Sequence, residues 1–346
     1  MVINKVFSIM KLASLNNNSI DGELIVVSKN LKFFTSAQHI SPTMQYALDN
    51  WAEVSKNLKK LYHNLNKDNV KKNIFDQTKV LSPLPRAYQW ADGSAYVNHV
   101  SLVRQARGAM IPDSFWYDPL MYQGGSDDFT APRSPILIQD EKFGIDFEAE
   151  VAVISDYVCM GSGLKTIDDK ILLVMLANDV SLRNLIPQEI NKGFGFYQSK
   201  PSTSFSPVAV TIDELGESWS KNKLFHIIRV DLNNKPFGRT ETGIDMTFSF
   251  SDLILHASKT RNLRAGSIIG SGTVSNRDKN GGPGLPINEG GKGYACIAEL
   301  RMVETIKYGK PKTKFLKFGD KVSIEVLDKS NQSVFGKIEQ IVKNKR

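Results

Sequence analysis

The sequence is poor in cysteine and contains no long run of apolar residues. Only Cys159 and Cys296 occur in 346 residues, they form no CxxC pair, and their spacing matches no zinc site. A disulfide scaffold and a zinc centre are therefore not expected, and a reducing cytoplasm is the predicted location. The longest obvious apolar run, residues 171–177, is far shorter than the roughly 20 residues of a membrane helix, so we expect no membrane partner.

The amino-terminal residues do not predict a secretory signal. The first ten residues are too short and too weakly patterned for one, and we expect residues 1–9 to form a loose extension or to precede an alternative start at Met10.

Basic residues exceed acidic ones, yet they do not form a nucleic-acid signature. The formal net charge is +8, and the densest basic patch spans residues 56–72. Leu58, Leu61 and Leu65 recur there at helical spacing, which predicts an amphipathic helix with a solvated basic face. We therefore expect no nucleic-acid partner, although a positive field can draw an anionic substrate towards a cleft.

Short β-rich runs separated by Gly, Asn and Pro turns dominate the second part of the chain. A proline-punctuated connector at residues 81–86 divides a predicted amino-terminal domain (residues 1–80) from a larger domain (residues 81–346). The pattern predicts a β-dominated α+β fold of packed sheets and disfavours a doubly wound one. The predicted strands are residues 23–28, 31–34, 206–212, 226–232, 267–270, 294–305 and 321–327; the predicted helices begin at Ser41 and at Thr166, and the second contains residues 171–176.

A pair of glutamates on a predicted strand suggests metal chemistry. In residues 144–154 the apolar positions alternate with Asp146, Glu148 and Glu150, so the three carboxylates share one face, outside the apolar core. The apolar run 171–177 ends at Asp179, which supplies a further carboxylate. Converging carboxylates form the oxygen-rich site that Mg²⁺ or Ca²⁺ prefers, whereas an isolated Glu-x-Glu is more often a solvated outer face.

Several motifs occur together in one order along the chain. They are Asp92-x6-His99, Arg107-Gly108, Tyr122-Gln-Gly124, Glu148-x-Glu150, Asn178-Asp179-x3-Arg183, Lys200, Ser206-Pro207 and Gly270-Ser-Gly-Thr273. Their order and spacing resemble the fumarylacetoacetate hydrolase family, in its bacterial type, over residues 80–346. Residues 10–14 are similar to the start of that family's amino-terminal domain. The resemblance implies a fold with a small amino-terminal domain followed by a mixed-sheet β-sandwich or roll.

The resemblance also implies roles for individual residues. One divalent cation, Mg²⁺ or Ca²⁺ with Mn²⁺ as a further option, would be held by four carboxylates: Asp92, Glu148, Glu150 and Asp179. The implied catalytic residues are His99 as general base, Glu299 as its orienting carboxylate, and Lys200. The implied substrate contacts are Arg107, Tyr122, Arg183, Gln188 and Thr273.

This chain departs from the family pattern at two places. Residues 184–188 contain one residue more than the pattern, so the position of Gln188 can slip. Ser94 stands where a substrate-contacting tyrosine is expected, with Tyr96 two residues further on.

The implied activity is hydrolysis of a carbon–carbon bond in fumarylacetoacetate, a dicarboxylate diketone of tyrosine and phenylalanine breakdown, by a homodimer. An acylpyruvate hydrolase, or a keto-acid decarboxylase or isomerase on the same scaffold, remains an alternative. A noncatalytic binding protein is disfavoured, because such a protein would be free to lose at least one of His99, Glu148 and Lys200.

Overall fold

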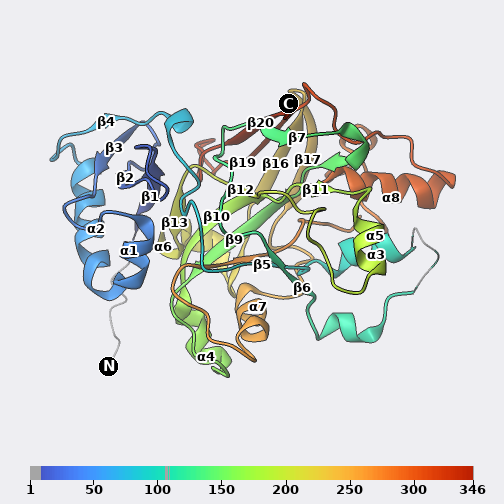
Figure 1. The fold of residues 1–346 in the computed structure, drawn as a ribbon, viewed down its shortest axis with the longest axis horizontal. Helices are drawn as coiled ribbons and strands as arrows, with labels where there is room; N and C mark the ends of the chain where they lie inside the picture. The colour runs from blue at the N-terminus through green and yellow to red at the C-terminus, as the bar shows by residue number, and fades with distance from the viewer. Residues whose placement is uncertain (1–8, 106–107, 109, 346) are drawn as a thin grey trace.

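Two β-sheets organise the chain in the computed structural model, which describes residues 9–105, 108 and 110–345 (Figure 1). The larger sheet contains eleven strands among these residues. Across it run β4 (Asn73–Ile74), β3 (Phe33–Ser36), β2 (Glu23–Val27), β1 (Lys11–Leu15), β13 (Ala209–Thr211), β10 (Ile171–Asn178), β9 (Ala149–Ser155), β18 (Ser267–Gly270), β5 (Trp90–Gly93) and β6 (Met121–Gly124), while β12 (Ser204–Phe205) pairs with β10 off this path.

The smaller sheet packs on the larger one. Its order is β17 (Lys235–Glu241), β16 (Ile227–Leu232), β19 (Lys321–Val326), β20 (Ile338–Asn344) and β7 (Ile136–Ile138). Val151 and Val174 of the larger sheet share one apolar core with Val230 and Ile324 of the smaller sheet. Two short ladders complete the β-structure described here: β8 (Ile145–Asp146) with β11 (Ser181–Leu182), and β14 (Trp219–Ser220) with β15 (Lys223–Leu224).

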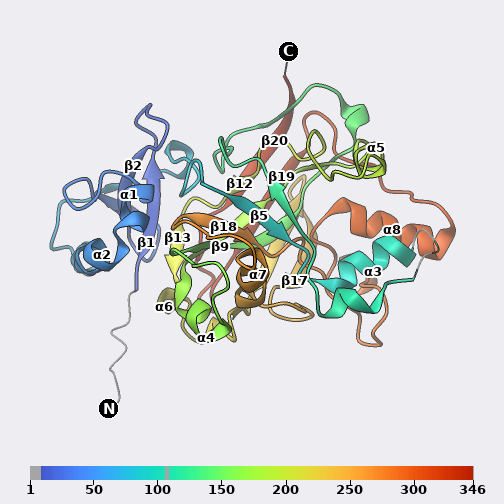
Figure 2. The same ribbon diagram turned by 60° about the horizontal axis from the view of Figure 1, so that its bottom comes forward.

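The helices lie at the ends and edges of the sheets. They are α1 (Met44–Asp49), α2 (Trp51–Asn66), α3 (Val97–Gln105), α4 (Leu164–Ile167), α5 (Ile186–Asn191), α6 (Ile212–Leu215), α7 (Phe250–Ala257) and α8 (Ile297–Tyr308). Short 3-10 turns occupy Gln77–Lys79, Asp113–Trp116, Glu141–Phe143, Asp168–Lys170, Gly216–Ser218 and Ile287–Glu289. Figures 1 and 2 both place α1 and α2 at one end of the molecule and α3, α5 and α8 at the other. Within the described part of the chain, no helix combines the length and apolar character required to cross a membrane.

The amino-terminal strands are continuous with the larger sheet. β1 pairs antiparallel with β13, with Lys11 opposite Val210 and Leu12 opposite Ala209. α2 covers these strands through Leu58, Leu61 and other buried residues, which confirms the predicted amphipathic helix. The preceding helix begins at Met44 with Thr43 as its cap, so the predicted cap at Ser41 is wrong by two residues.

The β-dominated α+β fold is confirmed, with a small amino-terminal part and a larger mixed-sheet part. The predicted helix over residues 171–176 is wrong, because these residues form β10. β10 lies inside the larger sheet, with Val174 in one core and Met175 in the other. A strand buried on both faces is apolar at every position, so its sequence lacks the period-two alternation that separates a strand from a buried helix.

The predicted strand over residues 294–305 is also wrong, because Ile297–Tyr308 form α8. The helix begins after Cys296, whose sulfur accepts the Glu299 N–H, and it ends at Gly309 in the left-handed region at φ 77°. Cysteine is not among the residues preferred at a helix start, so the sequence carried no ordinary start signal. Glu299 therefore lies in the first turn of a helix, not on a strand.

Candidate active site

Four carboxylates meet where several strands of the larger sheet end. Asp92 is the penultimate residue of β5, Glu150 lies in β9, Glu148 directly precedes β9, and Asp179 directly follows β10. The register brings them together, since Ala177 of β10 is opposite Glu150 and the Asp179 N–H donates to the Glu148 carbonyl at 3.0 Å. One carboxylate oxygen from each of the four lies within 4.8 Å of those of the other three.

Glycine makes room for this cluster on β18. Gly270 pairs with Asp92 in parallel register, and a Cβ at Gly270 would lie 2.2 Å from the Asp92 Oδ1. Gly272 adopts φ 74°, a left-handed conformation that favours glycine, and its N–H donates to the same oxygen at 2.9 Å. The Gly270-Ser-Gly-Thr273 motif therefore allows the backbone to approach the Asp92 carboxylate closely.

The carboxylates are buried, and one of them lacks partners. Asp179 and Glu150 are fully buried, and Asp92 and Glu148 nearly so. Neither carboxylate oxygen of Glu150 has a hydrogen-bond partner among the described residues. Burial, together with the neighbouring carboxylates, raises the pKa of both Glu150 and Asp92 well above the usual range. Such a cluster needs nearby positive charge to remain ionised at neutral pH.

Two cations supply part of that charge. Lys200 Nζ donates to Glu148 Oε2 at 2.9 Å and to Asp179 Oδ2 at 2.5 Å. Burial acts to lower the pKa of Lys200, but the attraction of Asp179 and Glu148 outweighs it and the pKa is raised. Arg183 Nη2 lies 2.5 Å from Glu148 Oε1, so Glu148 faces two cations. Burial acts to raise the pKa of Glu148, but the attraction of Lys200 and Arg183 outweighs it and the pKa is lowered.

The donor set suits one hard divalent cation. The four carboxylates outnumber the two cations beside them, Lys200 and Arg183, so a divalent ion would offset negative charge that these cations leave. Oxygen ligands of this kind are those that Mg²⁺, Ca²⁺ and Mn²⁺ prefer. The unpartnered oxygens of Glu150 provide ligand atoms that no protein group in the described chain uses. The residues present therefore fit a divalent cation.

Further donors converge on Asp179. The Tyr122 hydroxyl donates to Asp179 Oδ2 at 2.5 Å, and the Thr203 hydroxyl donates to Oδ1 at 2.6 Å. Burial raises the pKa of Tyr122 well above its usual range, so its hydroxyl remains a donor at neutral pH. The adjoining cavity is lined by Tyr122, Thr273, Ser94 and Tyr96. The Tyr96 hydroxyl donates to the Thr242 carbonyl.

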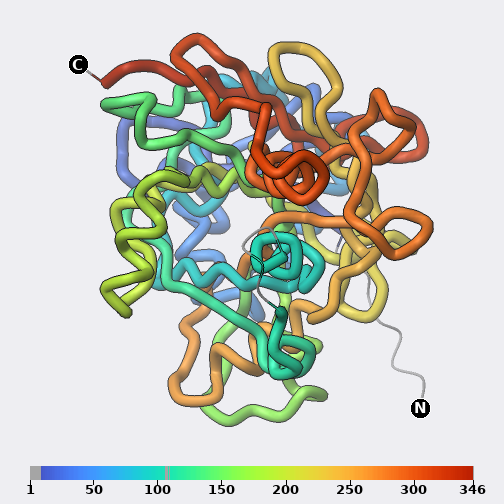
Figure 3. The backbone as a smooth tube through the Cα atoms, turned by 90° about the vertical axis from the view of Figure 1, so that its right-hand side faces the viewer, coloured from blue at the N-terminus to red at the C-terminus, as the bar shows by residue number. Residues whose placement is uncertain are grey.

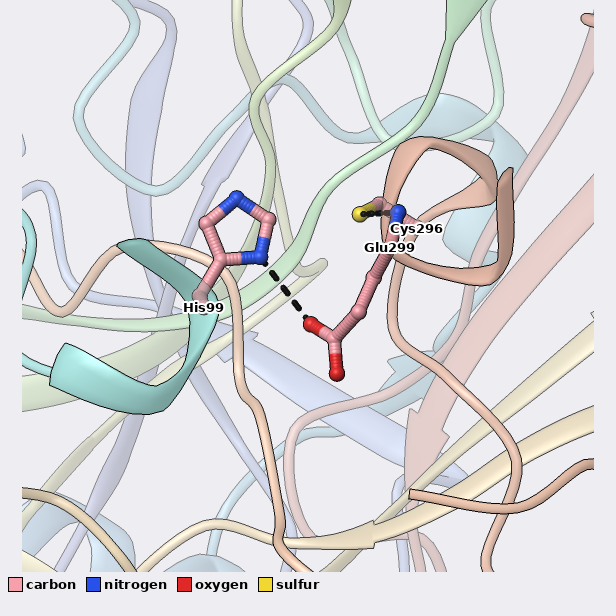
Figure 4. A group of neighbouring side chains, drawn as sticks. All are labelled: His99, Cys296 and Glu299. Atoms are coloured by element: carbon pink, nitrogen blue, oxygen red, sulfur yellow. Dashed lines mark hydrogen bonds and ion pairs between the residues drawn. The ribbon is translucent and has the colours of Figure 1, made fainter. Parts of the chain in front are cut away.

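A histidine–glutamate pair lies beside the cluster. His99 Nδ1 from α3 is 3.0 Å from Glu299 Oε2 from α8, and Figure 4 shows the two side chains facing one another. The other Glu299 oxygen accepts a hydrogen bond from the Ser275 hydroxyl at 2.9 Å, and Ser275 in turn accepts one from Asn98 Nδ2 at 2.7 Å. These hydrogen bonds fix the Glu299 carboxylate in front of His99 Nδ1. In the neutral imidazole Nδ1 therefore carries the proton, and Nε2 is available as a base.

A second group of potential metal ligands contains His99, Cys296 and Glu299 (Figure 4). Burial raises the pKa of the Cys296 thiol well above its usual value, and its sulfur already accepts the Glu299 N–H. His99 and Glu299 are bonded to each other. These three residues are therefore poorer metal ligands than the four carboxylates.

One cavity of about 420 Å³ connects these groups. Asp92, Glu148, Lys200 and Thr273 line it together with His99. One face each of α3, α5 and α8 forms its walls, and Figure 3 views the molecule from the side on which these helices lie. The cavity therefore unites the carboxylate cluster, the histidine and space for an organic substrate.

One predicted substrate contact is not brought to this cavity. Gln188 is exposed on α5, whose contributions to the cavity are Ile186 and Ile190. Arg107 lies outside the described residues, as does the start of the predicted loose extension, residues 1–8.

The structure adds residues that sequence motifs did not single out. Asp146 accepts the N–H groups of Ile297 and Ala298 at 2.8 and 2.9 Å, and Arg183 Nε at 2.9 Å. It thereby ties the start of α8 to the charged cluster. Its place on one strand face with Glu148 was the only signal in the sequence.

Ser275 and Arg301 were also not predicted. Ser275 follows the Gly270–Thr273 motif by two residues, and Arg301 follows Glu299 by two. Ser275 donates to Glu299, and Arg301 lines the cavity. Neither position carries a sequence motif, because both contacts arise only when α8 packs beside the carboxylate cluster.

Comparisons with known proteins agree with this arrangement. Residues 89–343 match the model described as fumarylacetoacetate hydrolase C-terminal, and residues 10–86 match fumarylacetoacetase N-terminal domain 2. An uncharacterized protein of Pyrococcus abyssi is 25% identical over 188 residues, which are 54% of this chain and 78% of that protein.

Solved structures share the fold at low sequence identity. Maleylpyruvate hydrolase from Sphingobium sp. SYK-6 has a TM-score of 0.64 at 12% identity, covering 97% of this chain and 100% of that one. Fumarylacetoacetate hydrolase from Exiguobacterium antarcticum has a TM-score of 0.61 at 14% identity, with the same coverage. A probable 2-hydroxyhepta-2,4-diene-1,7-dioate isomerase from Mycobacterium abscessus has a TM-score of 0.63 at 16% identity, covering 98% and 99%. With two family models covering most of its length, the chain belongs to the fumarylacetoacetate hydrolase family.

Proposed function

We propose that this protein is a metal-dependent hydrolase that cleaves a carbon–carbon bond in an acylpyruvate or acylacetoacetate. Fumarylacetoacetate is the leading substrate, and fumarate and acetoacetate are the products. The observation that carries the proposal is that the cluster of four buried carboxylates opens through Asp92 and Glu148 onto the cavity that His99, held by Glu299, also lines. Carboxylates of this kind suit a divalent ion, and an oriented imidazole suits the activation of water.

The proposed ligands of one Mg²⁺, Ca²⁺ or Mn²⁺ ion are Asp92, Glu148, Glu150 and Asp179. When bound, such an ion supplies Lewis-acid polarisation of the substrate's carbonyl oxygens. A manganese ion is present with pyruvate in one structure of the Sphingobium maleylpyruvate hydrolase. Lys200 holds Glu148 and Asp179 through two of its three N–H donors, which leaves one donor for a substrate oxygen.

His99 is the proposed general base. Its Nε2 takes a proton from water, while Glu299 holds Nδ1–H and stabilises the charge that develops on the ring. The hydroxide adds to the acyl carbonyl, and the bond to the neighbouring carbon then breaks. The electron pair remains on the departing carbon, which takes up a proton, so one water is consumed for each bond cleaved.

The remaining donors in the cavity bind and orient the substrate. Thr273 offers a hydroxyl group to its carbonyl or carboxylate oxygens, and Arg183 offers positive charge. The Tyr122 hydroxyl, which donates its proton to Asp179, lines the cavity beside them. Arg107 and Gln188 remain predicted contacts.

The alternative is a keto-acid decarboxylase or an isomerase on the same scaffold. Both hydrolases and isomerases are named among the solved structures with this fold. The His99–Glu299 pair favours hydrolysis, because activation of water requires a base beside the acyl carbonyl. A noncatalytic role would give the buried Lys200, with its two carboxylate partners, no function.

A substrate panel tests the proposed function. The ultraviolet absorbance of fumarylacetoacetate should fall when protein and Mg²⁺, Ca²⁺ or Mn²⁺ are added, and EDTA should prevent the fall. Oxaloacetate and a neutral acylpyruvate, measured at the same pH and with the same metal, should be poorer substrates. Release of CO₂ from oxaloacetate, without cleavage of any diketone acid, would favour the decarboxylase and contradict the hydrolase.

We propose that residues 1–80 serve packing and assembly and contribute no catalytic group. The described residues of the candidate site all follow residue 90, and the amino-terminal strands extend an edge of the larger sheet. We also propose a homodimer, which sedimentation velocity would test; a monomer at assay concentrations would contradict it.

A further inference from the structure

The wall of the cavity formed by α8 carries a cation that has no assigned role. Ala298, Arg301, Met302 and Thr305 line the cavity from one face of α8, since they are spaced by three or four residues. The start of α8 is tied to Asp146 beside the carboxylate cluster. At 1.5 Å per residue, Arg301 lies about 5 Å further along the helix than Ala298, towards the end away from the cluster.

Apolar side chains line the same cavity as this arginine. They come from α3, α5 and α8 and from the segment that follows α8: Val100, Val103, Ile186, Ile190, Met302 and Phe315. In Figure 3, α3, α5 and α8 surround the side of the molecule that faces the viewer. A ligand that extends from the carboxylate cluster into this cavity would therefore contact hydrocarbon as well as Arg301.

The Arg301 guanidinium has donors to spare. Its Nη1 donates to the Thr313 carbonyl, and its plane lies 4.2 Å from the centre of the Phe315 ring. Arg301 forms no ion pair with any carboxylate in the described part of the chain. The nearby Glu304 carboxylate already accepts three hydrogen bonds from Lys312 and Thr313. A guanidinium has five N–H donors in a planar fork that matches a carboxylate, so most of them are free for a ligand.

We propose that Arg301 is a specificity-determining residue that binds a terminal carboxylate on the acyl group of the substrate. The substrate class is then an acylpyruvate or acylacetoacetate whose acyl group is a short, apolar, unbranched linker ending in a carboxylate. This inference rests on the proposed hydrolase function and goes beyond it, because it assigns the far end of the substrate to one residue. Phe315 and the Thr313 carbonyl hold the guanidinium in place for that contact.

The test compares two substrates that differ only at the acyl end. One is fumarylacetoacetate, and the other carries a neutral carboxamide in place of the acyl-end carboxylate. Arg301→Gln should raise KM for the carboxylate substrate by about 10- to 100-fold, the usual worth of a charge-assisted hydrogen bond, with kcat within about threefold. KM for the carboxamide should change by less than about threefold. Arg301→Lys should recover part of the lost affinity, because it restores the charge without the fork.

Arg264→Gln is the matched control. Arg264 is an exposed arginine over the ring of Tyr157, at 5.9 Å, and does not line the cavity, so this change should leave both substrates unaffected. If Arg301→Gln weakens both substrates equally, or neither, the inference is overturned while the hydrolase function stands. If the wild-type protein with metal cleaves neither substrate, the proposed function fails, and the inference fails with it.

Discussion

Replacing Glu299 by glutamine tests the proposed water-activating pair of His99 and Glu299. The replacement changes which ring nitrogen of His99 carries the proton. Ser275 accepts a hydrogen bond from Asn98, so its own hydroxyl hydrogen is directed to Glu299 Oε1. In Glu299→Gln the new carbonyl oxygen must take that position, and the new NH₂ group then faces His99 Nδ1. This amide donates to Nδ1 and forces the proton onto Nε2, where the ring can no longer accept a proton from water.

The expected loss follows from these contacts. Loss of a charge-assisted hydrogen bond alone costs about 1.5–3 kcal/mol, or roughly 10- to 150-fold in kcat. The inverted tautomer adds to this, so we expect kcat to fall by about 10³- to 10⁴-fold, as orienting carboxylates in other enzymes show. His99→Ala should fall into the range of about 10²- to 10⁴-fold that is typical of a lost general base.

The assay is steady-state kinetics on fumarylacetoacetate, with metal affinity measured by calorimetry on the same preparations. Metal affinity should be unchanged in Glu299→Gln. Adding Ser275→Ala to Glu299→Gln removes the donor that fixes the amide and should recover part of kcat. His256→Gln is the matched control, because His256 lies 3.5 Å from Asp118 outside the cavity. Wild-type kcat in Glu299→Gln, or no recovery in the double variant, would refute this reasoning.

Three further changes test other parts of the molecule. Glu150→Gln should weaken Mg²⁺ or Mn²⁺ binding in calorimetry by about 10-fold or more, because it removes a charged ligand oxygen, and unchanged affinity would contradict its assignment. Gly270→Ala should lower the free energy of unfolding in urea by roughly 1–3 kcal/mol, because the new Cβ would lie 2.2 Å from Asp92 Oδ1. Gly125→Ala is its control, because no atom lies closer than 3.8 Å to the new Cβ. An equal loss of unfolding free energy in the two variants would contradict the claim that a side chain at position 270 crowds Asp92. Burial lowers the pKa of Lys11 from 10.5 to about 8. Between pH 8 and pH 10.5 the folded protein therefore binds fewer protons than the unfolded chain, so the free energy of unfolding should rise with pH in this range. The rise should be on the order of 3 kcal/mol; Lys11→Met should abolish it, and a flat wild-type profile would show the premise to be wrong.

The carboxylate cluster was predictable because its signals are local. Period-two alternation places Glu148 and Glu150 on one face of the predicted strand, and Asp179 follows almost directly after an apolar run. Strand pairing then needs only to place the ends of β9 and β10 side by side, as the register of Ala177 opposite Glu150 does. The fold class could be predicted for the same reason, since most β-rich runs are separated by recognisable turns.

The wrong predictions share a physical cause. Residues 171–176 lie between two apolar cores, so the sequence shows a continuous apolar run without any period. α8 starts at a cysteine cap and buries Ile297 and Val303 in two different apolar clusters. Its β-branched residues are typical of a strand. In both segments tertiary burial, and not local preference, determines the backbone.

The far end of the cavity could not be predicted at all. Arg301 and Val100 lie about 200 residues apart in the chain and line one cavity only because α3 packs beside α8. No motif marks either residue. The substrate's reacting end is thus encoded in local patterns, whereas recognition of its far end depends on packing between distant helices.

The most direct test of the central claim is a metal titration of chelator-treated protein during cleavage of fumarylacetoacetate. We predict no cleavage above the uncatalysed rate without metal, and a linear rise in rate that reaches its maximum at about one divalent ion per chain. Asp179→Asn, assayed in parallel, should require more metal and reach a lower rate, because Asp179 is a proposed ligand. Cleavage at the full rate by protein shown by elemental analysis to be free of metal would contradict the account.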